Sequence, residues 1–343
     1  MKLGAYTACL HDRTLEETLE ILKGLGLDSV EINAGGFIGT PHLPVDELLE
    51  SEDARREYLA VFDRYGVELT ALNCNGNPLH PDPEVHHAED LKRTIRLAGL
   101  LGIKTVITMS GLPATEPGAT RPSWTVIPWD SVYKETLDYQ WNEVAVPFWK
   151  EIQLLAAEHD VQVAIEMHPH NLVFNPATMK RLVELTTPEG GINHVGAEMD
   201  PSHLFWQHID PVRAIEDLGD LVFFAAAKDT LIHETAAVNG VLDDRFEWIP
   251  AEEHPLGLGG HYTVTRWPAV PGWSFVAVGR GHEVDFWTRF LTALQEHTPV
   301  RAVNIEHEDA TFGQVEGLQF AAENLIAAAE KAGLRGPTEG PAS

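Results

Sequence analysis

The stretch Val161-Gln-Val-Ala-Ile-Glu-Met-His-Pro-His-Asn171 joins a β-strand pattern to a run of polar side chains. Its apolar residues, which include Val163 and Ile165, recur at every second position and predict a strand over residues 161–166. Glutamate, two histidines and an asparagine then follow with little interruption. The strand therefore leads directly into a segment whose side chains can carry chemistry.

Similar short apolar runs alternate with longer amphipathic segments along the chain. They predict strands at residues 3–8, 29–32, 67–72, 105–109, 161–166, 195–199, 221–227 and 302–305. Amphipathic patterns predict helices at residues 14–24, 44–65, 87–101, 137–159 and 314–332. Eight strand–helix units imply a parallel sheet and predict an α/β fold, the (β/α)8 TIM barrel. A doubly wound sheet is the competitor, but no Gly-x-Gly-x-x-Gly follows the first strand.

We expect one TIM-barrel domain over residues 1–335, with long loops on its carboxyl-terminal face. Two stretches interrupt the alternation of strands and helices: residues 111–139 are rich in proline and tryptophan, and residues 231–282 show little periodicity. Both follow predicted strands, so both belong on the face where the strands end. Long loops there are usually lids or binding walls, and the alternative is a packing or oligomer arm. Residues 336–343 are typical of a flexible tail.

Composition limits the classes of partner. The chain has 343 residues, 44% of them hydrophobic, and a formal net charge of −28. A surface this acidic repels phosphate backbones, so we expect no nucleic-acid partner. Cys9 and Cys74 do not make a disulfide framework in a chain of this length, which favours a reduced, cytoplasmic environment. No signal peptide or membrane span is visible, and we expect no membrane partner.

Three acidic residues stand at the ends of predicted strands: Glu166, Asp200 and Glu306. In a TIM barrel, polar residues at the carboxyl ends of strands indicate the active site. Three converging carboxylates repel one another, and a divalent cation removes that cost. Carboxylate, imidazole and water ligands favour Mn²⁺ or Mg²⁺, with Zn²⁺ or Co²⁺ as alternatives. For any one of these acids alone, a salt bridge or a helix cap is the simpler interpretation.

Two further residues are candidate catalytic groups. His168 lies two residues beyond Glu166, so the two side chains share a face if the strand geometry persists. An imidazole there is suited to removing a proton from a carbon next to a carbonyl that the cation polarises. Lys228 follows the seventh strand and would stabilise an enolate or pair with an acid.

Five more residues are candidate substrate-binding groups. His203 follows Asp200 by three residues and would bind metal or a substrate hydroxyl. The other four would line the pocket, although a purely structural role is the simpler interpretation for each: His80, Ser110, Arg280 and His282.

Three motifs carry a resemblance to a known family: Ala164-Ile-Glu-Met-His-Pro-His, Glu198-Met-Asp-Pro-Ser-His and Val303-Asn-Ile-Glu-His-Glu-Asp. They look like the xylose-isomerase-like sugar isomerase and epimerase barrels, over about residues 1–335. The resemblance implies that the three strand-end acids bind a divalent metal together with the histidine of a His-x-Lys-Asp motif. Here that motif reads Ala226-Ala-Lys-Asp, so Ala226 stands where the histidine is expected. The site would then use water, His203 or another side chain, or be weakened.

A narrower set of features resembles the alpha subunits of bacterial C-glycoside deglycosidases. These features are Gly76-Asn-Pro-Leu-His-Pro-Asp-Pro, the motif around His168, the tryptophan-rich loop and Gly279-Arg-Gly-His. The resemblance implies a lyase acting on 3-keto glycosides, in which His168 takes the C2 proton and the C1–aglycone bond breaks by β-elimination. It also implies a small beta subunit, and therefore a hetero-oligomer.

Three other hypotheses remain at this point. The first is an aldose–ketose isomerase or keto-sugar 3-epimerase, in which Glu166 and Glu306 exchange the proton. The second is a barrel nuclease acting at abasic DNA sites, which the negative charge and the absence of a basic stripe disfavour. The third is a sugar-binding barrel that has lost its chemistry, which Ala226 alone supports.

Overall fold

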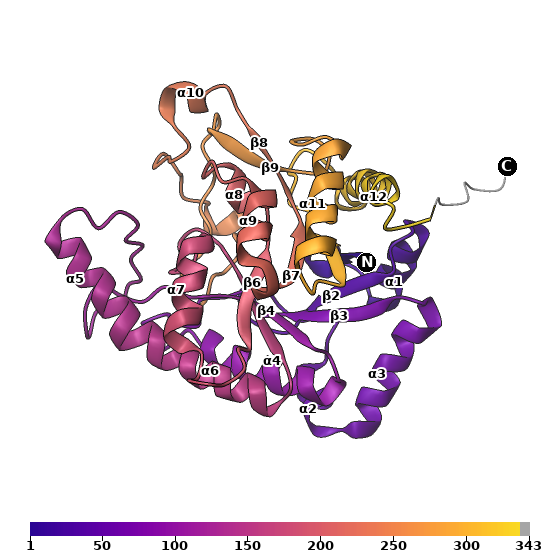
Figure 1. Ribbon diagram of the computed structural model, residues 1–343, viewed down its shortest axis with the longest axis horizontal. Helices are drawn as coiled ribbons and strands as arrows, with labels where there is room; N and C mark the ends of the chain where they lie inside the picture. Colours follow the sequence, from indigo (N-terminus) through magenta and orange to yellow (C-terminus); the bar gives the residue numbers. More distant parts are fainter. Residues whose placement is uncertain (337–343) are drawn as a thin grey trace.

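The computed structural model describes residues 1–336, and its strands close into a barrel (Figure 1). Eight parallel strands follow one another around it in the order β1-β10-β7-β6-β5-β4-β3-β2. They are β1 (Lys2–Tyr6), β2 (Ser29–Asn33), β3 (Glu68–Asn73), β4 (Thr105–Met109), β5 (Gln162–Glu166), β6 (Val195–Met199), β7 (Val222–Ala227) and β10 (Ala302–Ile305). The predicted TIM barrel is confirmed. Every predicted strand is present to within two residues at each end.

Helices surround the barrel on its outside (Figure 1). The principal ones are α1 (Leu15–Gly24), α3 (Glu52–Tyr65), α4 (His87–Leu101), α6 (Val146–Glu158), α7 (Pro176–Thr186), α9 (Pro211–Leu218), α11 (Val284–His297) and α12 (Gln314–Lys331). Their apolar faces pack on the outer face of the strands, as in α4, where Leu91, Ile95 and Ala98 are fully buried. None of the helices within residues 1–336 is long and apolar enough to cross a membrane.

Two predicted helices differ from the structure. The helix expected at residues 44–65 is divided into α2 (Val45–Glu50) and α3, because Ser51 takes an extended conformation and its hydroxyl accepts the Ala54 backbone N–H at 3.1 Å. The helix expected at residues 137–159 begins earlier, as α5 (Ser131–Tyr139), and passes through a π-helical turn into α6. Pro147 lies just after that turn and cannot donate a backbone hydrogen bond, which disrupts the α-helical pattern there.

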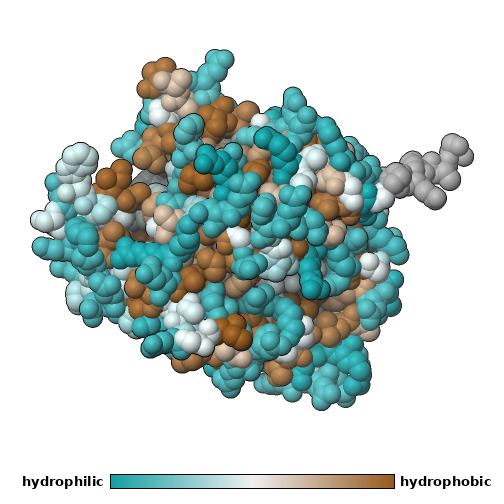
Figure 2. Space-filling model, in the orientation of Figure 1, coloured by the Kyte–Doolittle hydropathy of each residue, from teal (hydrophilic) through white to brown (hydrophobic). Residues whose placement is uncertain are grey.

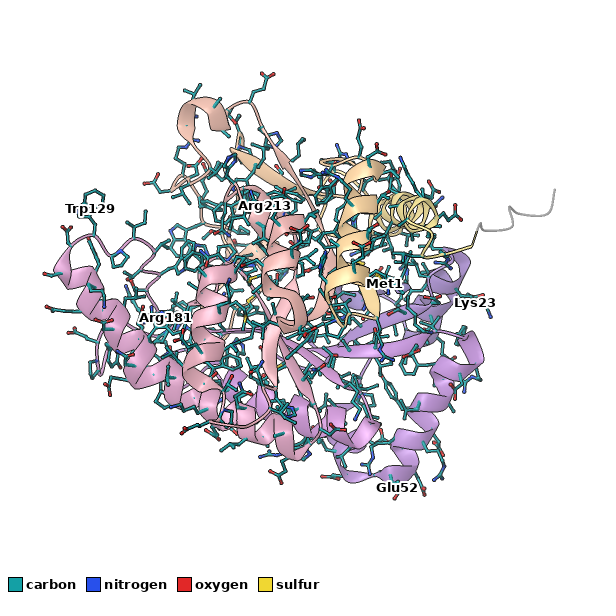
Figure 3. All side chains as sticks on the ribbon, in the orientation of Figure 1. Met1, Lys23, Glu52, Trp129, Arg181 and Arg213 are labelled. Carbon is teal, nitrogen blue, oxygen red and sulfur yellow. The ribbon has the colours of Figure 1, made fainter. Side chains whose placement is uncertain are left out.

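The two long stretches leave the barrel after β4 and β7. The first folds back through a bridge between Ala114 and Pro122 and then enters α5, which projects away from the barrel at the left of Figure 1. Trp129 lies in this stretch with 90% of its surface exposed, and Figure 3 shows it pointing away from the molecule.

The second stretch is more regular than its sequence indicates. It begins and ends in an antiparallel pair, β8 (Asp229–Ile232) with β9 (Trp273–Val276), and carries the short helix α10 (Ala236–Asn239) near its tip. We call residues 229–282 the β8–β9 arm. Apolar residues show on the surface at its tip and near α5, whereas hydrophilic residues cover most of the face seen in Figure 2.

Of the predicted tail at residues 336–343, only Gly336 lies within the described part of the chain. The remaining residues of that stretch lie outside it.

The barrel interior changes character along its axis. Alanines and phenylalanines fill its amino-terminal end, where Ala71, Ala164, Phe224 and Ala302 belong to one apolar cluster. The middle and the carboxyl-terminal end are polar, and they hold buried acids and amides such as Glu166. Because TIM-barrel interiors are usually packed with branched apolar residues, a polar interior marks the end where chemistry is performed.

Candidate active site and metal-binding group

Three strand ends bring the predicted metal ligands together. Glu166 is the last residue of β5, Asp200 follows β6, and Glu306 follows β10. One carboxylate oxygen from each lies within 4.8 Å of the other two. Glu166 and Asp200 are 1% exposed, so two of the three carboxyl groups are withdrawn from water. The alternation along each strand directs these side chains into the barrel.

Burial makes it costly to ionise all three acids. It raises the pKa of Asp200 to about 7, and it raises the pKa of Glu306 well above its usual value although Lys228 opposes the effect. Burial also raises the pKa of Glu166, but the hydrogen bond from His203 and the charge of His168 lower that pKa overall. A divalent cation would let all three carboxylates ionise, because it supplies the missing positive charge.

Lys228 already supplies one positive charge beside this group. Its ammonium lies 2.9 Å from Glu306 Oε1 and 3.0 Å from Glu308 Oε1, and 4.5 Å from the centre of the Phe275 ring. Burial alone would lower the pKa of Lys228, but the carboxylates of Glu306 and Glu308 raise it well above its usual value. Lys228 is therefore a fixed cation that can stabilise developing negative charge, and it is not a base.

His203 lies between two of the predicted metal ligands. Its Nε2 is 3.1 Å from Glu166 Oε1 and 3.3 Å from Asp200 Oδ2, and the side chain is fully buried. Burial lowers its pKa to about 3, and its contact with Glu166 is a hydrogen bond. Within the described residues, its Nδ1 has no hydrogen-bond partner. His203 is thus placed to orient the two carboxylates, and together with Glu166 and His168 it also forms a second group that could hold a metal ion.

His168 is the half-buried base candidate next to His203, and the two ring centres are 4.2 Å apart. A nitrogen of His168 also lies within 4.8 Å of ligand atoms of Glu166 and His203. Its Nδ1 donates to the Pro169 carbonyl at 2.6 Å. In the neutral ring Nε2 therefore carries the lone pair, which is the arrangement a general base needs.

The other predicted pocket residues have partners elsewhere. Ser110 is buried, and its hydroxyl accepts the Val173 backbone N–H at 2.8 Å. His80 accepts the Asp82 backbone N–H at 3.1 Å, and its ring lies 5.3 Å from that of Tyr262.

Arg280 and His282 belong to the end of the β8–β9 arm. Arg280 pairs with Asp309 at 2.6 Å, and His282 Nδ1 is 2.7 Å from Asp229 Oδ1 while its ring stacks on Phe205 at 3.7 Å. These contacts do not join either residue to the three carboxylates. A substrate-binding role for them, and for His80 and Ser110, stays a prediction.

The structure adds site residues that the sequence did not single out. Asn75 donates from Nδ2 to Glu166 Oε2 at 2.6 Å, and its buried Oδ1 has no partner among residues 1–336. Asn75 belongs to the polar run after β3, so its place at a strand end was an available signal. Phe275 reaches Lys228 from β9, and its ring centre is 5.5 Å from that of His203. No sequence pattern indicates that contact, because β9 lies in the arm.

Ala226 faces the barrel interior, two residues before Lys228 on β7 and paired with Asn304 of β10. Its methyl group cannot ligate a metal. The remaining donors nevertheless fit a divalent cation, because three carboxylate oxygens converge. Asn75 is hydrogen-bonded to Glu166 through its amide nitrogen, and its amide oxygen has no partner among residues 1–336.

Comparison with known proteins shows what the chain is similar to. The family described as "Xylose isomerase-like TIM barrel" matches residues 19–328. The Bacillus subtilis protein described as "Uncharacterized protein YfiH" is 36% identical over 330 residues, which are 95% of this chain and 98% of that protein.

Two solved structures share the fold at lower identity. The IOLI protein with a bound zinc atom is 20% identical, with a TM-score of 0.58 over 97% of this chain and 99% of that one. A D-tagatose 3-epimerase-like protein is 18% identical, with a TM-score of 0.57 over 96% of this chain and 99% of that one.

Proposed function

The chain belongs to the xylose isomerase-like TIM barrel family, and on that premise we propose that it is a divalent-metal-dependent enzyme that moves a proton next to a sugar carbonyl, as an isomerase or epimerase. The observation that carries the proposal is the convergence of Glu166, Asp200 and Glu306 within 4.8 Å. The similar solved structures include a D-tagatose 3-epimerase-like protein, which favours epimerase or isomerase chemistry over the lyase expected from the narrower resemblance.

Each residue has a chemical role in this proposal. Glu166, Asp200 and Glu306 would hold the cation, which when bound polarises a substrate oxygen and acidifies the neighbouring C–H. His168 is placed to take that proton on Nε2, because its Nδ1 is held by the Pro169 carbonyl. Lys228 offsets the negative charge that develops on the substrate oxygen, and Phe275 covers the ammonium and limits its contact with water.

The fate of the proton separates the two reactions. When the proton returns to the adjacent carbon and the hydroxyl proton moves to the former carbonyl oxygen, an aldose becomes a ketose. Inversion of the same carbon instead requires a second group that donates a different proton from the opposite face. Glu306 is the candidate for that second group, because its carboxyl lies within 4.8 Å of the other two acids at the site.

A lyase is the second candidate, favoured by one observation: β-elimination needs a single base, and His168 supplies one without drawing on the three carboxylates. On a 3-keto glycoside, removal of the C2 proton leaves an electron pair that forms the C1–C2 double bond. The C1–aglycone bond then breaks, and the aglycone leaves with its electron pair. A small beta subunit and a hetero-oligomer belong to this candidate alone.

The test follows deuterium into the substrate. Metal-loaded protein is incubated in D₂O with a panel of ketoses and aldoses, and with 3-keto glycosides for the lyase. We expect deuterium at the carbon next to the carbonyl, and its loss in Glu166→Gln together with the bound metal. Glu252→Gln, an exposed acid on the arm, is the matched control and should retain both.

The outcomes separate the candidates. Deuterated isomers or epimers support the main proposal, and release of free aglycone from 3-keto glycosides supports the lyase. Metal-loaded protein that exchanges no proton in any of these sugars would contradict both, and would leave a barrel that binds sugar without turnover.

A further inference from the structure

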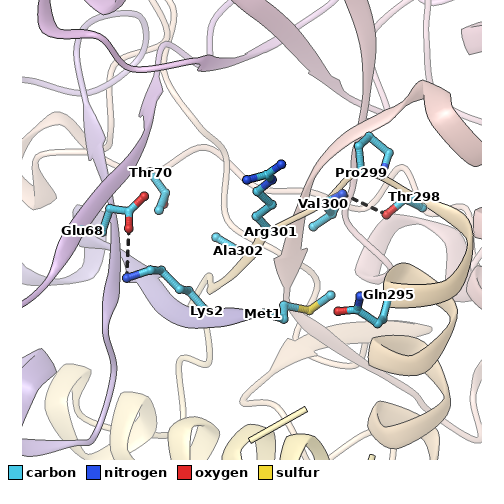
Figure 4. Close-up of a pocket in the computed structure, with 10 residues that line it drawn as sticks. All are labelled: Met1, Lys2, Glu68, Thr70, Gln295, Thr298, Pro299, Val300, Arg301 and Ala302. Atoms are coloured by element: carbon cyan, nitrogen blue, oxygen red, sulfur yellow. Dashed lines mark hydrogen bonds and ion pairs between the residues drawn. The ribbon is translucent and has the colours of Figure 1, made fainter.

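A second hollow lies at the opposite end of the barrel, where the strands begin. It encloses about 470 Å³ and is lined by the first residues of β1, β3 and β10, which are Lys2, Glu68 and Ala302, together with Thr70 and Arg301 (Figure 4). A larger adjoining hollow of about 1020 Å³ shares these five residues. We call the two together the floor pocket.

The barrel interior above the floor pocket is built from small residues and phenylalanines. TIM-barrel interiors are usually filled by layers of bulky branched side chains. Here Ala302 lines both hollows, and it belongs to one apolar cluster with Ala71, Ile107, Ala164, Phe223 and Phe224. Gly196 pairs with Ala164 on the neighbouring strand. A Cβ at Gly196 would come within 2.7 Å of the Phe223 ring, so the phenylalanine packs where the glycine has no side chain.

Part of the wall of the larger hollow is apolar, although Asp63, Glu68 and Lys104 also line it. Phe223 and Phe224, at the start of β7, line the larger hollow together with Phe62 and Leu69. Phe224 is 3% exposed and Phe223 is 9% exposed, so both rings form the floor rather than the surface. An apolar ligand body would exclude water from this wall, which is the usual driving force for filling such a cavity.

The rim carries an arginine without a partner. Lys2 is paired with Glu68 at 2.9 Å, as the dashed line in Figure 4 shows. The Arg301 side chain has neither a hydrogen bond nor an ion pair among residues 1–336, and Figure 4 shows its guanidinium extending over the opening. Its free donors match the two oxygens of a carboxylate.

We propose that the floor pocket binds an organic monoanion with an apolar body, with its carboxylate on Arg301 and its body against Phe223 and Phe224. The volume of about 470 Å³ at the rim falls in the range of small-molecule sites. The pocket is separated from Glu166 and Asp200 by the length of the barrel strands. It does not depend on the metal or on the proposed chemistry, so it is a second binding site.

Isothermal titration calorimetry with octanoate on the metal-free full-length protein tests the proposal. We expect saturable binding of one octanoate per chain. Affinity should rise about fourfold for each methylene from butanoate to octanoate, because each added group is buried. Neutral 1-octanol should bind at least tenfold more weakly than octanoate.

Variants of Arg301 and of a control arginine test whether octanoate binds in the floor pocket. Arg301→Glu should weaken octanoate binding at least tenfold, and Arg301→Gln should weaken it by a smaller factor. Arg96→Glu is the matched control, because Arg96 is an exposed arginine that does not line the pocket, and binding should be unchanged. Circular dichroism verifies that each variant is folded.

Three results would overturn the inference. They are the absence of saturable binding at millimolar octanoate, equal affinity in Arg301→Glu, and equal affinity for 1-octanol.

Discussion

At the scale of single residues, Ala226 is the position where a change should add function. A side chain at this β7 position faces the interior, and Lys228 two residues later reaches Glu306 at 2.9 Å. We expect Ala226→His to bind Mg²⁺, Mn²⁺ or Zn²⁺ about tenfold more tightly or better, because it adds an imidazole to the three carboxylates. Titration calorimetry on metal-free protein measures the change.

The double variant Ala226→His with Glu166→Gln is the control for Ala226→His. It should lose the gain, because the imidazole would then lack its partner carboxylate. Unchanged metal affinity in Ala226→His, with a folded protein, would show that the position lies outside the coordination group.

Only those residues of the candidate site that the order of the strands brings together could be predicted from the sequence. Glu166, Asp200 and Glu306 could be grouped because the ends of parallel barrel strands meet on one face. The contacts of Lys228 could not be predicted, since the choice between stabilising an enolate and pairing with an acid depends on side-chain directions. The structure gives the lysine two carboxylate partners, and one of them, Glu308, was not singled out.

At the scale of elements, the strands were predictable because buried parallel strands read as short β-rich apolar runs between helices. The division at Ser51 was not, because Ser-Glu-Asp is compatible with a helix interior as well as a helix start. The β8–β9 pair was missed for a different reason. Each of its strands has four residues, and their pairing joins Asp229 to Val276 across the whole arm.

Asp229 should hold the base of the β8–β9 arm in place. Its carboxylate accepts the backbone N–H groups of Gly279, Gly281 and His282 at 3.0–3.1 Å, and the His282 ring at 2.7 Å. We expect Asp229→Asn to lower the free energy of unfolding by about 2 kcal/mol, because charge-assisted hydrogen bonds are weakened. Urea denaturation measures this loss.

Hydrogen exchange should localise the effect of Asp229→Asn. Exchange should become faster at residues 277–283 and in β9, which carries Phe275 to the site. Asp243→Asn is the matched control, since Asp243 is also in the arm but pairs only with Arg245. If both variants exchange like the parent protein, the arm is held by other contacts.

At the scale of the whole molecule, the barrel interior holds more acid than its cations can balance. Burial raises the pKa of Glu31 and of Asp200 to about 7, and raises those of Glu198 and Glu306 well above the usual value. Such groups bind protons more tightly in the folded than in the unfolded chain. Their contribution to stability is therefore greatest below the unfolded values near pH 4, and it is lost as the pH rises. Glu166 has a lowered pKa, so its contribution to stability is lost only when the pH falls below the unfolded value.

The pH dependence that these buried acids give to stability leads to a prediction for the metal-free protein. In the presence of a chelator, the free energy of unfolding should fall as the pH rises from about 6.5 to about 7.5, because ionised carboxylates must then share the interior. Below that range, histidines whose pKa is lowered by burial, such as His203 and His11, favour the folded chain as the pH rises and oppose the fall. Saturating divalent metal should remove much of that fall, since the cation binds the ionised acids of the folded chain only. Urea denaturation at several pH values, with and without metal, measures both effects. Stability that is flat or rises over this range without metal would mean that the interior acids are already balanced, and the electrostatic case for a cation would then fail.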